Sequence, residues 1–125
     1  MDNLESVFPE LANDSYRLDS DIELGNNLTL VAAYINAASY QFLKMLAEFD
    51  RRKCWANDGA RCCSQWLNWK CGISRSAARD KLRMAHCLEK LPEINKAFAK
   101  GDLSYSKVRA MTRIATDDNE KYLLV

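Results

Sequence analysis

Basic side chains recur at helical spacing in the middle of the chain. Arg75, Arg79 and Arg83 stand four residues apart, and His86 and Lys90 continue the series. At 100° per residue, these five groups fall within about 80° of one helical face. Guanidinium groups bind phosphates and pair bidentately with guanine, so the pattern could serve a nucleic-acid duplex. A basic stripe alone favours the alternative, a solvated face that keeps a small domain soluble, and DNA binding is favoured only together with the turn and the helix that precede the stripe.

The residues before this series predict a turn between two helices. An apolar-faced segment at about residues 60–70, with Asp58 as a candidate N-cap, ends at Gly72, a residue that tolerates a left-handed turn. Ser74 or Ser76 can then cap a helix that continues to about residue 90. We therefore predict a helix-turn-helix at about residues 60–90, whose second helix would enter the major groove of DNA.

The predicted DNA contacts lie on this second helix and on the basic segments around it. The first-line contacts are Arg75, Ser76, Arg79 and Arg83. The candidate phosphate contacts are Lys70, Lys107, Arg109 and Arg113. Phosphate contacts usually outnumber base contacts in protein–DNA interfaces.

Charge is strongly segregated along the chain, although the 125 residues carry a net charge of only +1. Residues 1–50 hold nine acidic and two basic side chains, whereas residues 51–116 hold five acidic and fifteen basic ones. Such asymmetry is typical of a basic part that binds a polyanion. Mutual neutralisation of two packed halves explains the charge pattern equally well.

A long helix is expected between residues 21 and 50, with Asp19, Ser20 or Asp21 as its cap. Its apolar residues alternate at spacings of three and four, the pattern of a heptad seam. The seam consists of Leu28, Val31, Ile35, Ala38, Phe42, Met45 and Phe49. We expect this seam to be a core stripe within the chain, and a homodimer through the helix of residues 28–49 is the alternative.

The remaining segments complete an all-α prediction. Residues 1–19 are expected to be a flexible arm or a short helix, followed by one helical domain over residues 20–125. Pro92 suits the first turn of a short helix that ends at Gly101. Asp102 or Ser104 then caps a helix over residues 105–116, and a further helix starts at residues 117–118. The chain stops within an apolar stretch, so we expect truncation at the C-terminus.

Other chemistries find little support in the sequence. The five cysteines (Cys54, Cys62, Cys63, Cys71 and Cys87) include no C-x-x-C pair, so buried free thiols are favoured over a zinc site. A single histidine, His86, and the lack of phosphate-binding or nucleophile motifs leave no catalytic site and no cofactor to predict. We expect Trp66 to be a core residue, whereas Trp69 is the tryptophan that is open to solvent.

No apolar run approaches the length of a membrane span, and the acidic N-terminus does not resemble a signal peptide. We therefore expect a cytoplasmic protein that makes no membrane contact, in which thiols stay reduced.

Residues 72–114 resemble the helix-turn-helix of ParB-type partition proteins. The resemblance rests on Gly72-Ile73-Ser74-Arg75, Leu82-Arg83, Leu91-Pro92 and Gly101-Asp102-Leu103-Ser104. The chain differs from those proteins by about one extra helical turn, at residues 86–90. The resemblance implies that the helices in this segment are arranged to bind DNA.

A second resemblance covers most of the chain, from about residue 24 to residue 125. The sequence resembles bacterial domain-of-unknown-function family 222, also called the 13E12 repeat family. The residues that carry it include Ala47-Glu48-Phe49-Asp50, Trp55, Gly59, Trp66-Leu67, Gly72-Ile73-Ser74, Leu82-Arg83-Met84-Ala85, Leu91-Pro92 and Gly101-Asp102-Leu103-Ser104. Members usually form the N-terminal region of HNH endonuclease-like proteins, which implies that a nuclease domain follows. We therefore expect a module that targets DNA, with a helical interaction module as the alternative.

Overall fold

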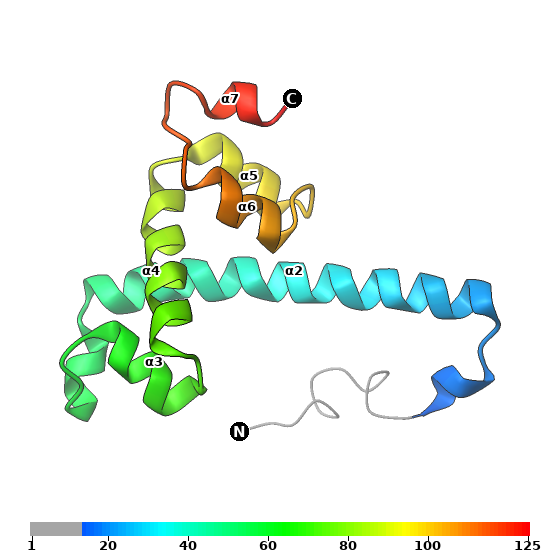
Figure 1. Ribbon diagram of the computed structural model, residues 1–125, viewed down its shortest axis with the longest axis horizontal. Helices are drawn as coiled ribbons and strands as arrows, with labels where there is room; N and C mark the ends of the chain where they lie inside the picture. Colours follow the sequence, from blue (N-terminus) through cyan, green and yellow to red (C-terminus); the bar gives the residue numbers. More distant parts are fainter. Residues whose placement is uncertain (1–13) are drawn as a thin grey trace. The chain divides into compact units, whose positions relative to one another are not determined.

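The computed structural model describes residues 14–125, and all regular structure in that range is helical. The elements are η2 (Ser15–Leu18), α2 (Asp21–Arg51), η3 (Cys54–Asp58), α3 (Cys63–Cys71), α4 (Arg75–Glu89), α5 (Pro92–Ala99), α6 (Tyr105–Met111) and α7 (Glu120–Leu123) (Figure 1). The all-α prediction is confirmed. No helix among these residues is both long and apolar enough to cross a bilayer.

The chain divides into two compact units, Met1–Tyr34 and Ile35–Val125. In the first unit, Ser20 begins α2 through a reciprocal cap: the Glu23 backbone N–H donates to the Ser20 hydroxyl, and the Ser20 N–H donates to the Glu23 carboxylate. The predicted arm falls mostly on residues 1–13, which lie outside the described residues. Its last part, η2, is a short 3₁₀ helix, in line with the short helix that we considered.

The predicted long helix is confirmed, but its buried face is not the predicted one. The buried residues of α2 are Leu43, Leu46 and Ala47. Leu28, Ile35 and Met45 of the heptad seam are 66%, 60% and 69% exposed. The prediction of a core stripe is therefore wrong for most of the seam. Leu43 and Leu46 directly follow the seam residues Phe42 and Met45. The face of α2 that the rest of the second unit covers is therefore rotated by about 100° from the seam.

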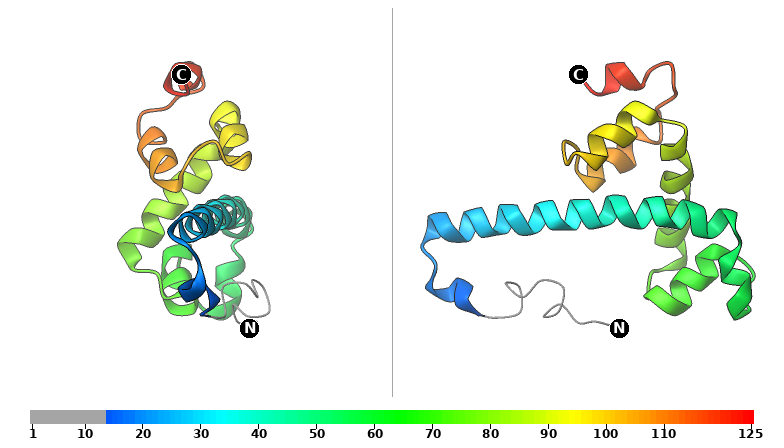
Figure 2. Two further views of the ribbon diagram at one scale, coloured as in Figure 1. Left: turned by 90° about the vertical axis from the view of Figure 1, so that its right-hand side faces the viewer. Right: turned by 180° about the vertical axis from the view of Figure 1, so that it is seen from behind.

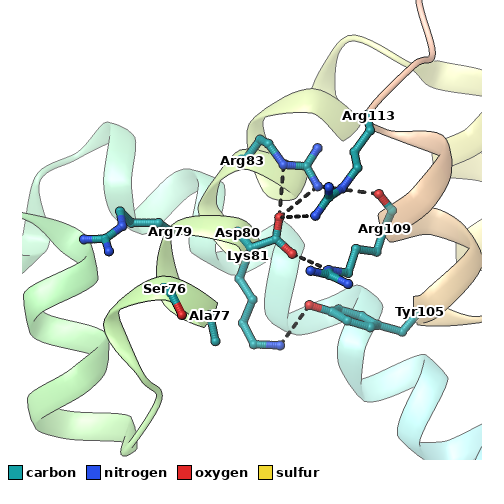
Figure 3. Close-up of a pocket in the computed structure, with 9 residues that line it drawn as sticks. All are labelled: Ser76, Ala77, Arg79, Asp80, Lys81, Arg83, Tyr105, Arg109 and Arg113. Carbon is teal, nitrogen blue, oxygen red and sulfur yellow. Dashed lines mark hydrogen bonds and ion pairs between the residues drawn. The ribbon is translucent and has the colours of Figure 1, made fainter.

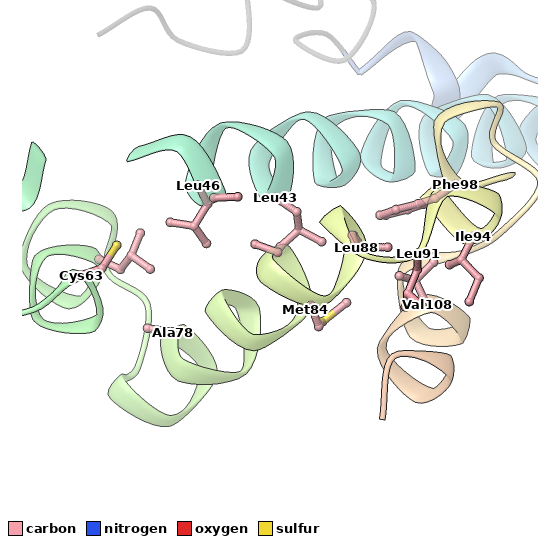
Figure 4. Packing of buried hydrophobic residues seen from close by; sticks show 13 residues of the cluster. Leu43, Leu46, Cys63, Ala78, Met84, Leu88, Leu91, Ile94, Phe98 and Val108 are labelled. Atoms are coloured by element: carbon pink, nitrogen blue, oxygen red, sulfur yellow. The ribbon is translucent and has the colours of Figure 1, made fainter. Parts of the chain in front are cut away.

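One hydrophobic core holds the second unit together (Figure 4). Its fully buried large side chains come from α2 to α6 and are Leu43, Cys63, Leu67, Met84, Ile94, Phe98 and Val108. Phe42 and Phe49, which belong to the seam, are half-buried against this core. The Tyr40 ring meets the Phe98 ring edge to face, with centroids 5.5 Å apart. This core fixes the helices that carry the basic residues.

The helix before the turn begins later than expected. Asp58 was predicted as its N-cap, but α3 starts at Cys63, and the Asp58 carboxylate instead accepts a hydrogen bond from the Trp66 indole at 2.8 Å. Trp66 is half-buried rather than fully buried, and its ring tilts against Phe49 with centroids 4.4 Å apart. Trp69 is exposed, as predicted.

A three-residue turn connects α3 to α4. Gly72 adopts a φ of 68°, the left-handed conformation that glycine accepts without strain. The Asn68 side chain donates to the Ile73 carbonyl at 3.0 Å, and the Ser74 hydroxyl caps α4 by accepting from the Ala77 N–H. In Figures 1 and 2, α3 lies at the N-terminal end of α4, and α5 and α6 lie at its other end. The helix pair therefore forms largely where the sequence predicted it.

The last helices follow the predicted order with shifted ends. Pro92 stands in the first turn of α5, and the Ser104 hydroxyl caps α6 by accepting from the Lys107 N–H at 3.2 Å. The α6 helix ends at Met111 rather than at residue 116, and α7 starts at Glu120. The buried Glu120 carboxylate accepts the backbone N–H of Ile94 at 3.1 Å. This bond satisfies a free donor at the start of α5 and ties α7 to it.

Charged side chains from α2 and α4 form a set that we call the Asp50 cluster: Asp50, Arg51, Glu48, His86 and Glu89. The Asp50 carboxylate accepts from the Trp55 indole at 3.0 Å and lies 2.7 Å from His86 Nε2. Arg51 pairs with both Glu48 and Glu89. His86 was expected to extend the basic stripe, but these contacts direct it toward α2 instead.

Candidate functional site

An open pocket of about 740 Å³ lies beside the first half of α4, between this helix and α6. Its lining is mostly cationic and polar (Figure 3). The lining residues are Ser76, Ala77, Arg79, Asp80, Lys81, Arg83, Tyr105, Arg109 and Arg113. The serine caps of α4 and α6 fix where the two basic helices begin, and the core beneath them fixes their spacing.

Three arginines surround one carboxylate in this pocket, and we call Asp80, Arg83, Arg109 and Arg113 the Asp80 cluster. Asp80 Oδ1 accepts from Arg83 Nε at 3.1 Å and from Arg83 Nη2 at 3.0 Å. Asp80 Oδ2 accepts from Arg109 Nε, and Arg113 Nη2 lies 3.9 Å from Oδ1. The cluster therefore joins α4 to α6 and leaves positive charge in excess.

Hydrogen bonding sets the ionisation of this cluster. The hydrogen bond from Arg109 holds the pKa of Asp80 below its ordinary value, and Arg83 lowers this pKa further. Burial raises the pKa by a smaller amount than the bond from Arg109 lowers it. Asp80 in turn raises the pKa of Arg109, chiefly through the same bond. Both shifts favour the charged forms of Asp80 and Arg109.

Lys81 and Tyr105 form the other side of the pocket. Lys81 Nζ donates to the Tyr105 hydroxyl at 3.0 Å, and it lies 4.5 Å from the centre of the same ring. A cation in this position gains from the negative face of the ring. Lys81 thereby adds a fourth positive group next to the Asp80 cluster.

The model of a protein family, described as domain of unknown function (DUF222), matches residues 23–119. The chain belongs to this family. No curated protein and no solved structure matches it. The matched residues of this DUF222 chain include the whole lining of the basic pocket. The family match bears out the second resemblance, whereas the ParB-type and HNH associations remain predictions.

The structure brings five of the predicted site residues of the DUF222 chain to one pocket. These are Ser76, Arg79, Arg83, Arg109 and Arg113. Arg83, Arg109 and Arg113 converge on Asp80, whereas the Arg79 side chain points away from them (Figure 3). The predicted residues on α4 and α6 thus share one surface, as a common binding site would require.

The other three predicted site residues lie outside the pocket lining. Arg75 is exposed in the first turn of α4, with Nη2 3.8 Å from the Cys62 sulfur. Lys70 is exposed in the last turn of α3, and Lys107 is exposed on α6. None of the three belongs to the Asp80 cluster.

Arg83, predicted as a first-line contact, bonds to its own chain on several sides. Besides Asp80, its guanidinium donates to the Thr112 hydroxyl at 3.2 Å, and its side chain is half-buried. The predicted stripe is therefore divided: Arg75 and Arg79 are open to solvent, Arg83 joins α6, and His86 joins α2.

Sequence reasoning missed Lys81 and Tyr105 as members of the pocket and the role of Asp80 at its centre. The spacing of Asp80 and Arg83, three residues apart on one helix, was a visible signal for an ion pair. The bond between Lys81 and Tyr105 spans 24 residues and depends on how α6 packs against α4. No local pattern predicts it.

The cysteines are free and differ in their environments. Only Cys63 is buried, which corrects the prediction of buried thiols, and burial raises the pKa of its thiol to about 12. The Ser64 hydroxyl, 3.2 Å away, lowers the pKa of Cys62. Within residues 14–125, no group of three or more His, Cys, Asp or Glu side chains is arranged to hold a metal ion.

An apolar pocket of about 420 Å³ lies at the end of α2 in the second unit. Phe42, Met45 and Phe49 of the heptad seam line it, together with Trp66 and Cys71. The C-terminal part of the seam therefore remains open for contact.

Proposed function

We propose that this protein is a DNA-binding module that binds a duplex with the exposed side of α4 and α6. The observation that carries the proposal is the Asp80 cluster, in which one carboxylate meets three guanidinium groups at the edge of an open pocket. A basic face combined with two helices joined by a short turn is the pattern of many duplex-binding proteins.

The positions of the basic residues support a division of roles. Arg75, Ser76 and Arg79 are exposed in the first turns of α4, the part of a second helix that meets base edges in helix-turn-helix complexes. Arg109 and Arg113 would hold phosphates, with Lys70 and Lys107 as further phosphate contacts. Arg83 would keep the Asp80 cluster in place.

We also propose that the module targets DNA for an HNH endonuclease-like protein, as the family resemblance implies, and that it acts in the cytoplasm. Residues 14–125 would then position the duplex, and other residues would form the nuclease site. No residue of the basic pocket is assigned a catalytic role.

The test is a titration of a labelled DNA duplex by fluorescence anisotropy across a salt series. The variant combines Arg75→Gln, Arg79→Gln and Arg113→Gln, and it keeps Arg83 because that side chain is tied to Asp80 and Thr112. If Arg113 neutralises one phosphate, and Arg75 and Arg79 neutralise one each beside their base contacts, the log–log salt slope should shrink by roughly 2–3 units. Affinity should fall at every salt concentration.

A matched control removes the same charge elsewhere through Arg52→Gln, Lys100→Gln and Lys121→Gln, which are exposed and outside the basic pocket. We expect its salt slope to change by less than about 0.5 units, because distant charges are screened. Loss of slope in the control equal to that in the arginine variant would contradict the proposal. So would the absence of wild-type binding at about 50 mM salt.

The exposed heptad seam favours a second candidate function, a helical interaction module that forms a homodimer through α2. Leu28, Ile35 and Met45 have the spacing of a coiled-coil seam and remain largely exposed. Sedimentation at several concentrations tests it, with Ile35→Ser and Met45→Ser as the variant and Lys44→Ser as the control. A dimer that only the seam variant weakens would support this function, whereas a strict monomer would contradict it.

A further inference from the structure

Asp80 holds an inner position in the basic pocket. Its side chain is 19% exposed, whereas those of Arg109 and Arg113 are 51% and 56% exposed. Arg83 and Arg109 point their Nε groups at this carboxylate, one from α4 and one from α6. The Asp80 carboxylate is therefore less accessible to solvent than Arg109 and Arg113, which face the open side of the pocket.

The arginines have hydrogen-bond donors to spare. Each guanidinium carries five N–H donors, and Asp80 accepts only the Nε donor of Arg109. Arg113 approaches Asp80 no closer than 3.9 Å. An anion at the open side of the pocket can bond to the terminal nitrogens of both residues while Asp80 keeps its place.

The negative charge of Asp80 has two opposing effects on the binding of an anion in the basic pocket. Among the lining residues, Asp80 is the only acidic one. It neutralises part of the charge of Arg83 and Arg109, and it also repels any second anion that the arginines attract. The same carboxylate thus orients the arginines and reduces their attraction for a ligand.

We propose that Arg109 and Arg113 bind one phosphate group and that Asp80 limits the affinity of this site by acting as a built-in competing anion. The proposal rests on the proposed function where the phosphate belongs to the DNA backbone. Phosphate is the fitting ligand because planar guanidinium groups pair bidentately with its oxygens. A free polyphosphate would present the same chemistry.

The experiment uses Asp80→Asn, which keeps the size of the side chain and one oxygen acceptor while removing the negative charge. The amide nitrogen replaces the carboxylate oxygen that accepts from Arg83 or the one that accepts from Arg109. Binding of inorganic pyrophosphate and of the labelled duplex is measured separately by calorimetry and by anisotropy. Removing the negative charge beside the two arginines should tighten pyrophosphate binding by about tenfold. Asp102→Asn, an equal charge change at an exposed loop position, should alter binding less than twofold.

A second variant, Arg113→Gln, tests the phosphate site even if Asp80→Asn does not fold. Arg113→Gln removes a rim residue that makes no close bond to Asp80, and it should weaken pyrophosphate binding severalfold in both the wild-type and the Asp80→Asn background. Unchanged binding in Arg113→Gln would overturn the phosphate site. Unchanged or weaker binding in a folded Asp80→Asn variant would overturn the role of Asp80 as a competitor.

The two ligands separate this inference from the proposed function. Tighter pyrophosphate binding by Asp80→Asn without any duplex binding would support the phosphate site and contradict the DNA module. Duplex binding that depends on Arg75 and Arg79, together with pyrophosphate binding that Asp80→Asn leaves unchanged, would support the DNA module and overturn this inference.

Discussion

The Asp80 cluster and the Asp50 cluster both include residues of α4, yet their charges are balanced in opposite ways. Asp80 is the one carboxylate among three guanidinium groups. In the Asp50 cluster, the carboxylates of Asp50, Glu48 and Glu89 outnumber the cationic Arg51, and His86 lies between two of them. One cluster has a surplus of donors at an open pocket, and the other has a surplus of acceptors.

This difference divides α4 into two parts. Near the end of α4, His86 and Glu89 pair with residues of α2 and hold the two helices together. Near its beginning, Arg75 and Arg79 are exposed, and the Asp80 cluster leaves positive charge without a partner. The paired charges at the end of α4 make a structural contact, and the uncompensated positive charges at its beginning fit the anionic partner that we propose.

Asp50→Ala should have the largest effect on stability. It removes the acceptor of the Trp55 indole and the neighbour of His86 Nε2, so we expect the free energy of unfolding to fall by about 1–3 kcal/mol. Urea unfolding followed by circular dichroism measures the loss. Duplex affinity of the folded fraction should not change, and a large loss of affinity would break the separation between the clusters.

Arg83→Gln should lower both stability and affinity. The change removes hydrogen bonds to Asp80 and to the Thr112 hydroxyl, for an expected loss of about 1–1.5 kcal/mol in unfolding free energy. Arg109 and Arg113 would then be held less firmly in the pocket. Thermal unfolding and duplex titration check the two effects, and full stability with reduced affinity would mean that Arg83 is a direct contact instead.

The contribution of Asp80 to stability should depend on pH. Because its pKa is lower in the folded protein than in the unfolded chain, its contribution is fully present above the ordinary aspartate pKa of about 3.9. It is lost as pH falls through the lowered folded value. The free energies of unfolding of wild type and Asp80→Asn should therefore differ by a constant amount from pH 7 to about pH 5 and converge at lower pH. A difference that grows on acidification would contradict this sign.

Arg79→Gln should have the smallest effect on stability. Arg79 is exposed, and its side chain points away from the Asp80 cluster, so the free energy of unfolding should change by less than about 0.5 kcal/mol. Duplex affinity should nevertheless fall, in contrast to Asp50→Ala. Thermal unfolding with a parallel duplex titration tests this, and unchanged affinity would remove Arg79 from the interface.

The sequence predicted the helices better than the contacts between them. Ser74, Gly72 and Ser104 are local signals, because caps and left-handed turns depend on neighbouring residues, and the structure places all three as expected. Asp58 misled the prediction because a short acidic side chain can cap a helix or accept a distant indole equally well. The α3 helix accordingly begins at Cys63 and not near residue 60.

The candidate site could be predicted in part. The four-residue spacing of Arg75, Arg79 and Arg83 identified the helix, but it did not show that Arg83 would bond to Thr112, 29 residues away. The heptad seam likewise revealed an apolar stripe on α2 without revealing which elements would cover it. Periodicity describes one element, whereas burial and pairing depend on its neighbours.

Amide chemical-shift mapping with a DNA duplex tests the central claim most directly. On addition of a short duplex at low salt, we expect the largest shifts at residues 75–83 and 105–113, where α4 and α6 border the basic pocket. Residues of α5 and α7 should change little. Shifts that concentrate on α2 around the heptad seam, or an unchanged spectrum, would contradict the claim that the surplus arginines form a DNA-binding surface.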